Sequence, residues 1–141
     1  MEREDIVLDA SVIIKWFTQE EDKEKAIELR EQFLKGEIEI VCPDLILYEL
    51  TNALRYNQKF NQEDVEKAAE SLSEMELTIV LPLTSMLQKA IELSFTKNIT
   101  IYDAIYVALA SELNCKFITA DKKLHDKVKD LSFVLLLSDI K

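Results

Sequence analysis

The sequence predicts an α/β fold, specifically a three-layer α/β/α sandwich around a central parallel sheet of about five strands. Short apolar runs alternate with longer segments of helical periodicity along the whole chain, and at least one helix separates consecutive strands. Such an order requires parallel pairing with right-handed crossovers. Gly36 is the only glycine in 141 residues, which disfavours a turn-rich all-β sandwich. Because this length suits one domain, we expect residues 1–141 to fold as a single unit.

The strands are predicted from short apolar segments. The first, residues 6–8, reads Ile-Val-Leu, a sequence typical of a strand buried on both faces of a parallel sheet. Pro43 and Pro82 follow the second and third strands, where a proline ends regular pairing. The remaining strands are expected at 38–41, 77–81, 116–119 and 133–137.

The helices are predicted from apolar residues at helical spacing. One helix begins near Val12, and the next ends at Gly36, a typical C-terminal cap. The two helices between the second and third strands form an elaborated crossover rather than a second domain. The helices after the first are expected at 24–35, 45–56, 62–75, 83–97, 102–113 and 122–129.

Composition excludes several classes of function. The formal net charge of −10 argues against a protein that holds nucleic acid by bulk charge. A single glycine excludes the glycine-rich phosphate-binding loops. Cys42 and Cys115 indicate free thiols in a reducing cytosol, and no apolar run approaches the length of a membrane span. We therefore expect a cytoplasmic protein without a membrane partner or a signal peptide.

Two aspartates follow predicted strands. Asp9 comes directly after the first strand, and Asp121 comes two residues after the fourth. Ligands of an open parallel sheet bind beyond the carboxyl ends of its strands, so both carboxylates would meet at one site if these strands are neighbours at a switch point. Alternatively, each is an ordinary helix N-cap, because both precede helices.

Glu49 lies on an apolar helix face. Ile46, Glu49, Leu50 and Ala53 follow the i, i+3, i+4, i+7 spacing of a buried stripe. A buried carboxylate needs a partner or a cation because burying an unpaired charge is costly. Alternatively, Glu49 lies at the edge of the stripe, where it reaches solvent or pairs with Arg55.

Asp103 is in the first turn of the most apolar helix. Thr100 and Asp103 fit a capping box, so a purely structural role is open. The functional interpretation is favoured because four acids stand at segment ends or on an apolar face, in a fold that gathers them. Clustered carboxylates repel unless a cation neutralises them, and an all-oxygen site suits Mg²⁺ or Mn²⁺. Zinc is disfavoured because His125 is the only histidine.

Four blocks resemble the signature segments of PIN-domain ribonucleases, and most closely those of VapC-type toxins from toxin–antitoxin pairs. They are VLDAS at 7–11, YELTNAL at 48–54, IYDA at 101–104 and FITAD at 117–121. The resemblance extends from residue 7 to at least residue 126, in the order of the family. It implies a PIN-like fold over residues 1–141.

The resemblance also implies the chemistry. The family's four acids bind one or two Mg²⁺ or Mn²⁺ ions, and this role carries over to Asp9, Glu49, Asp103 and Asp121 as metal-binding and catalytic residues. Ser11 and Thr119 match polar positions beside the metal site. The implied reaction is hydrolysis of an RNA phosphodiester, in which activated water attacks in line and a 3′-hydroxyl leaves.

The implied partners are an RNA substrate, a second copy of the chain and a cognate antitoxin protein. Because the chain is acidic, local basic residues would have to hold the RNA, and salt-dependent binding is expected. The candidates are Lys15, Arg55, Lys59, Lys122 and Lys123.

Other functions are weighed against specific residues. A haloacid-dehalogenase-type phosphatase needs Asp-x-Asp after the first strand, where the second position here is Ser11. A receiver domain needs a phospho-accepting aspartate after the third strand, and residues 80–83 contain no acid. Two alternatives stay open, namely a catalytically inactive PIN-like scaffold that binds a protein and a housekeeping PIN nuclease for RNA maturation.

Overall fold

The computed structural model describes residues 3–141 and contains a five-stranded parallel sheet in the order β3-β2-β1-β4-β5. All four strand pairs are parallel, as the alternation of strands and helices predicts. The strands are β1 (Glu4–Leu8), β2 (Ile38–Pro43), β3 (Thr78–Val80), β4 (Lys116–Thr119) and β5 (Val134–Leu136). The edge strands β3 and β5 are shorter than expected because each has only three residues in register with its neighbour.

The helices confirm the predicted order, with ends that differ by one or two residues. The first, α1 (Ala10–Ile13), has only four residues and continues as a 3-10 turn over Ile14–Trp16. Gly36 follows α2 with a φ of 77°, a left-handed conformation that glycine adopts without strain. The other helices are α2 (Lys23–Leu34), α3 (Leu45–Arg55), α4 (Gln62–Glu74), α5 (Thr84–Lys97), α6 (Ile101–Leu113) and α7 (Lys122–Val128).

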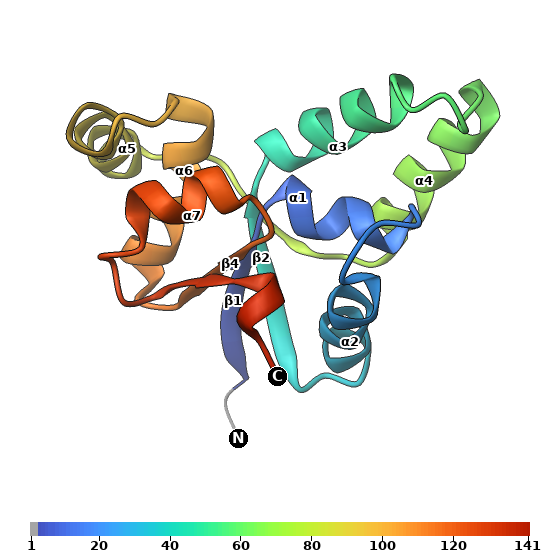
Figure 1. Cartoon of the computed structure of the whole chain (residues 1–141), viewed down its shortest axis with the longest axis horizontal. Coiled ribbons are helices and arrows are strands. Elements are labelled where there is room, and N and C mark those ends of the chain that lie inside the picture. The colour runs from blue at the N-terminus through green and yellow to red at the C-terminus, as the bar shows by residue number, and fades with distance from the viewer. Residues whose placement is uncertain (1–2) are drawn as a thin grey trace.

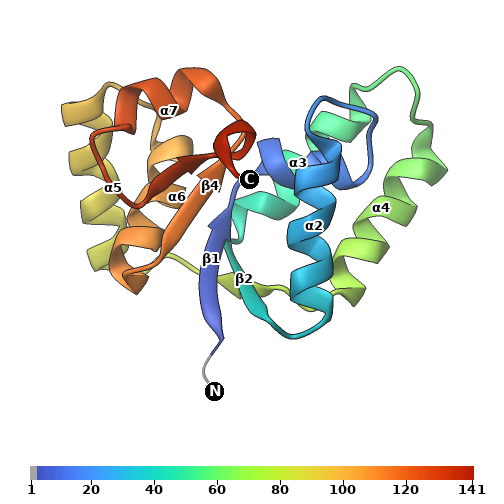
Figure 2. The same cartoon turned by 60° about the horizontal axis from the view of Figure 1, so that its bottom comes forward.

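The sheet is covered on both faces, which gives the three predicted layers. Successive strand residues point to opposite faces, so Ile6 and Leu8 pack into one core while Val7 packs into the other. The first core is closed by α1 to α4 and the second by α5 to α7. Figures 1 and 2 show these two groups of helices on opposite sides of β1 and β2.

The switch point of the sheet lies between β1 and β4. The chain moves from β1 to β2 and β3 on one side, then returns to place β4 and β5 on the other. The register aligns Leu8, the last residue of β1, with Ile118, and β4 ends one residue later at Thr119. This arrangement confirms that the strands preceding Asp9 and Asp121 are neighbours and therefore defines where a ligand site is expected.

Candidate active site

Asp9 occupies the carboxyl end of β1 and caps α1. Its side chain is 6% exposed, and it accepts a hydrogen bond from the Ser11 backbone N–H at 3.1 Å. The Ser11 hydroxyl donates to the same oxygen, Oδ1, whereas the Thr119 hydroxyl donates to Oδ2 at 2.6 Å. Asp9 is therefore the N-cap of α1, as the alternative role predicted. It also contacts Thr119, the last residue of the neighbouring strand β4.

The two hydroxyl groups also tie β1 to β4. Thr119 is fully buried, and its Oγ1 lies 3.3 Å from Ser11 Oγ. Ser11 Oγ accepts from the Ala120 N–H at 2.8 Å, and Thr119 Oγ1 accepts from the Asp121 N–H at 3.1 Å. This network fixes the orientation of Asp9 and the backbone that leads to Asp121.

Glu49 lies beside the buried stripe of α3 and is half-buried. Its Oε1 accepts a 2.6 Å hydrogen bond from the hydroxyl of Tyr106, a buried residue of α6. The expected alternative partner, Arg55, instead lies with its guanidinium carbon 4.9 Å from the centre of the Tyr56 ring. Ala53 is exposed, so the buried stripe is Ile46, Leu50 and Leu54, and Glu49 stands at its edge.

Asp103 lies in the first turn of α6. Thr100 is the N-cap, and its hydroxyl oxygen accepts from the Asp103 N–H at 3.0 Å, which confirms that half of the expected capping box. Lys127 of α7 is close enough to favour the ionised form of Asp103, while its ammonium donates to the Asn98 carbonyl at 2.9 Å. The Asp103 carboxylate therefore lies between α6 and α7.

Asp121 is the N-cap of α7. Its Oδ1 accepts from the backbone N–H groups of Lys123 and Leu124, at 3.0 and 3.1 Å. The capping role is thus present here too. It leaves the carboxylate at the same end of the sheet as Asp9, because β1 and β4 are adjacent.

The four carboxylates share one electrostatic environment. Burial raises the pKa of Asp9 to about 6, and the charge of Asp103 adds to this effect. Burial likewise raises the pKa of Glu49, again with a contribution from Asp103. The pKa of Asp103 is raised first by burial and then by the charge of Asp121. Asp103 is therefore the group that links the other three.

This donor set fits a hard divalent cation. Across residues 3–141, no basic side chain forms an ion pair with Asp9, Glu49, Asp103 or Asp121. Carboxylate oxygens that form no ion pair are suited to Mg²⁺ or Mn²⁺. Among residues 3–141, however, no three acidic, histidine or cysteine side chains are arranged so that together they could hold a metal ion.

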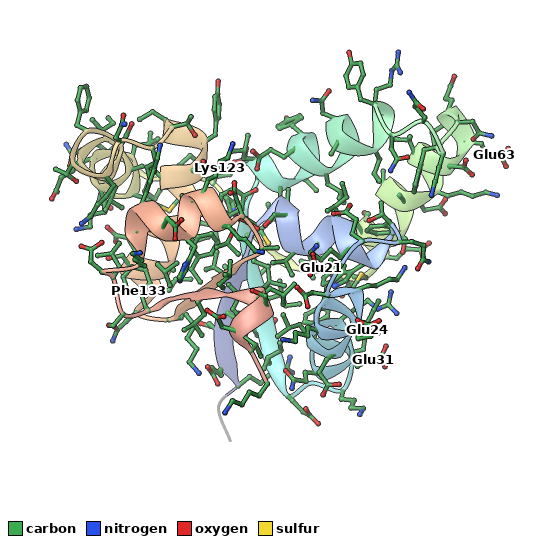
Figure 3. The ribbon with its side chains drawn as sticks, in the orientation of Figure 1. Glu21, Glu24, Glu31, Glu63, Lys123 and Phe133 are labelled. Carbon is green, nitrogen blue, oxygen red and sulfur yellow. The ribbon has the colours of Figure 1, made fainter. Side chains whose placement is uncertain are left out.

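The expected basic residues separate into two groups. Arg55, Lys59, Lys122 and Lys123 are exposed. Lys15 is buried, and its ammonium donates to the Glu21 carbonyl at 2.8 Å, so its assignment to the RNA-binding set was wrong. In Figure 3 the labelled acids Glu24 and Glu63 lie on α2 and α4 at the right, whereas Lys123 lies on α7 near the centre.

The comparisons with known proteins agree with this geometry. The family model described as PIN domain matches residues 6–130. The chain belongs to the PIN-domain family. Among curated relatives of this PIN protein, Ribonuclease VapC3 of Pyrobaculum aerophilum is 32% identical over 126 residues, covering 86% of this chain and 93% of the relative. Ribonuclease VapC9 of Mycobacterium tuberculosis is 31% identical over 87 residues, covering 60% and 66%.

Solved structures confirm the PIN fold. A toxin–antitoxin complex from Klebsiella pneumoniae superposes with a TM-score of 0.72 and 14% identity, covering 96% of this chain and 99% of that one. The Mycobacterium tuberculosis toxin VapC20, described as cleaving the sarcin–ricin loop, gives a TM-score of 0.65 with 12% identity, covering 86% and 93%.

No helix described in this PIN protein is both long and apolar enough to cross a membrane.

One residue of this site was missed by the sequence reasoning. Tyr106 lies within the apolar run of α6, where its side chain resembles an ordinary core residue. The available signal was its hydroxyl group, because a buried tyrosine usually needs a hydrogen-bond partner. That partner is Glu49, which places α3 and α6 in direct polar contact.

Proposed function

We propose that this PIN protein is a Mg²⁺- or Mn²⁺-dependent endoribonuclease that hydrolyses RNA phosphodiester bonds. The observations that support the proposal are that Asp9 and Asp121 follow adjacent strands at the switch point, and that Asp103 interacts electrostatically with Asp9, Glu49 and Asp121. None of the four forms an ion pair with a described basic side chain. These four side chains would hold one or two ions. When bound, a divalent ion activates water and offsets the negative charge that develops on the phosphoryl oxygens.

The chain's own groups have distinct roles in this proposal. Ser11 and Thr119 orient Asp9 through hydrogen bonds to its two oxygens, and Tyr106 orients Glu49. Water adds to phosphorus, the bond from phosphorus to the 3′ oxygen breaks, and the 3′ oxygen leaves as a hydroxyl after gaining a proton. No histidine, serine or cysteine nucleophile is needed, and burial raises the pKa of the nearby Cys42 thiol to about 12, which keeps that thiol protonated.

The proposal further assigns this nuclease to a VapC-type toxin–antitoxin pair. Its support is the similarity to ribonucleases named VapC and to a solved toxin–antitoxin complex. A cognate antitoxin protein and a second copy of the chain are then the expected partners. The homodimer has independent support from an exposed apolar face at α5. This face consists of Leu83, the N-cap residue, together with Leu87, Ile91 and Phe95 of the helix.

Cleavage of end-labelled RNAs tests the activity. Wild-type protein and the Asp103→Asn variant are compared with Mg²⁺, with Mn²⁺ and with EDTA. We expect metal-dependent cleavage by the wild type and a loss of at least about a hundredfold in the variant, because Asp103 links the other three carboxylates. Asp126→Asn is the matched control, since Asp126 is an exposed aspartate of α7 outside the site.

Two other results of the cleavage assay would argue against the proposed function. Cleavage that survives Asp103→Asn would contradict the assigned site and point to a contaminating ribonuclease. If neither protein cleaves, thermal unfolding with Mn²⁺ separates the alternatives. A wild-type melting temperature that does not rise with Mn²⁺ would favour the inactive protein-binding scaffold.

A further inference from the structure

An open pocket adjoins the carboxylate site. Its volume is about 690 Å³, and it lies between α3, the start of α4 and the start of α6. Two tyrosines on its wall are strongly exposed, Tyr48 at 69% and Tyr102 at 63%. The complete lining is Leu45, Tyr48, Glu49, Thr51, Asn52, Arg55, Val65 and Tyr102.

The two tyrosines are fixed to the same elements that position the carboxylates. Tyr48 precedes Glu49 on α3, whose opposite face is buried in the core. Tyr102 precedes Asp103 in the first turn of α6, which Thr100 caps. Glu49 belongs both to the pocket and to the carboxylate site, so the aromatic surface is continuous with the proposed reaction centre.

The other polar groups of the pocket suit a nucleotide. Tyr48, Asn52 and Arg55 follow one another at i, i+4 and i+7 on α3, so they share one helix face. Arg55 forms no ion pair with any described residue, and Glu49 is the only acid in the lining. An aromatic surface with one amide and one guanidinium that forms no ion pair can stack a base and contact its phosphate.

The net charge of the chain determines which kind of contact this pocket could contribute to RNA binding. At a net charge of −10, long-range attraction for RNA is weak, and affinity must come from short-range contacts. Stacking supplies affinity that does not depend on net charge, because every base has an aromatic face. Bases within a duplex are already stacked on one another, so the pocket would select unpaired nucleotides.

We infer that Tyr48 and Tyr102 form a stacking site for an unpaired RNA base next to the scissile phosphodiester, with Arg55 contacting the backbone. This inference rests on the proposed ribonuclease function and adds to it the side chains that would hold a nucleotide beside the scissile bond. The occupant is therefore the substrate rather than a peptide segment of a protein partner.

Binding measurements test the inference separately from cleavage. The fluorescence anisotropy of a short fluorescein-labelled single-stranded RNA is titrated with the full chain, with Ca²⁺ replacing Mg²⁺. The comparison ligands are an RNA of equal length with abasic positions and a blunt duplex. We expect Tyr48→Ala and Tyr102→Ala each to weaken single-strand binding by about tenfold. Tyr48→Phe and Tyr102→Phe, which keep the ring, are the matched controls and should stay within about twofold.

The ligands distinguish stacking from phosphate binding. Abasic RNA should bind the wild type as weakly as intact RNA binds the alanine variants, because both lack one partner of the stack. Wild-type affinity that is equal for intact and abasic RNA, or alanine variants that bind intact RNA like the wild type, would overturn the inference. Unchanged RNA binding together with lost binding to a co-expressed antitoxin would assign the pocket to a protein partner and would also overturn it.

Cleavage assays with the same proteins separate the two proposals. RNA binding that is weakened in the alanine variants but kept in the phenylalanine variants, with no cleavage by the wild type, would support the stacking site and contradict the nuclease. Metal-dependent cleavage by the wild type, with RNA binding that is the same in the wild type and the alanine variants, would support the nuclease and overturn the stacking site.

Discussion

Asp9 combines burial with a negative charge, and this combination makes its ionisation costly. Its pKa is raised to about 6, first by burial, from an ordinary value of 3.8. Because the folded state binds this proton more tightly than the unfolded state, the associated stability is complete below pH 4 and is lost as the pH rises through 6. The loss amounts to about 3 kcal/mol. A bound divalent ion would offset it.

This cost predicts that Asp9→Asn stabilises the metal-free protein at neutral pH. The variant should gain up to about 3 kcal/mol in free energy of unfolding at pH 7 relative to the wild type, and little at pH 4. Urea denaturation in EDTA at both pH values measures the difference. Asp126→Asn is the control, because its exposed carboxylate is outside the network. A gain of equal size at both pH values would contradict the assignment to Asp9 ionisation.

At the residue scale, sequence reasoning identifies groups whose position follows from the chain itself. Asp9 and Asp121 were predicted because they follow strands, and the adjacency of β1 and β4 places them together. Tyr106 was missed because its partnership with Glu49 joins residues 57 positions apart. Lys15 was misassigned because its burial depends on how the segment after α1 folds back to offer the Glu21 carbonyl.

At the element scale, helix and strand positions follow from local patterns, whereas the exact ends depend on neighbours. The alternation of buried residues in β2, with Ile40 and Cys42 in one core and Val41 in the other, matches a strand covered on both faces. The length of β3, by contrast, depends on its pairing with β2. Only Thr78 to Val80 is a strand because its register with β2 covers just these three residues, and no local pattern specifies that overlap.

The N-terminus of α6 gives a prediction at this scale. Thr100 satisfies the Asp103 N–H, so Thr100→Ala should lower the free energy of unfolding by about 1 kcal/mol. The same change should weaken Mn²⁺ binding, since the cap fixes the turn that presents Asp103. Chemical denaturation and calorimetric titration measure the two effects. Thr96→Ala is the matched control, because Thr96 is an exposed threonine whose hydroxyl donates to a carbonyl within α5. Equal effects of the two substitutions would contradict a capping role.

At the scale of the whole molecule, the outer surface of α5 is a candidate for contact with a second copy of the chain. Four exposed apolar residues recur every four positions from the N-cap of α5 onward, with Phe95 exposed at 85%. They are Leu83, Leu87, Ile91 and Phe95. Leu81, also exposed, precedes this face directly in the chain. Contiguous exposed apolar surface of this kind marks an interaction site. A stable protein interface buries about 800 Å² on each partner, so the residues around this face would also have to contribute.

The α5 face therefore predicts a homodimer that two charges would disrupt. In a symmetric dimer each substitution acts twice, because the same patch occurs on both sides of the interface. The double variant Ile91→Glu, Phe95→Glu should change the protein from dimer to monomer in light scattering, with an unchanged circular dichroism spectrum because both side chains lie outside the cores. Ser85→Glu adds a charge to α5 at an exposed position that is not three, four or seven residues from any member of this face, and this variant should remain dimeric. A wild-type monomer at all concentrations, or a dimer that survives both charges, would show that α5 does not join two copies. Since the carboxylates lie at the switch point and not on α5, the monomeric variant should keep its response to Mn²⁺, which separates the contribution of assembly from that of the metal site.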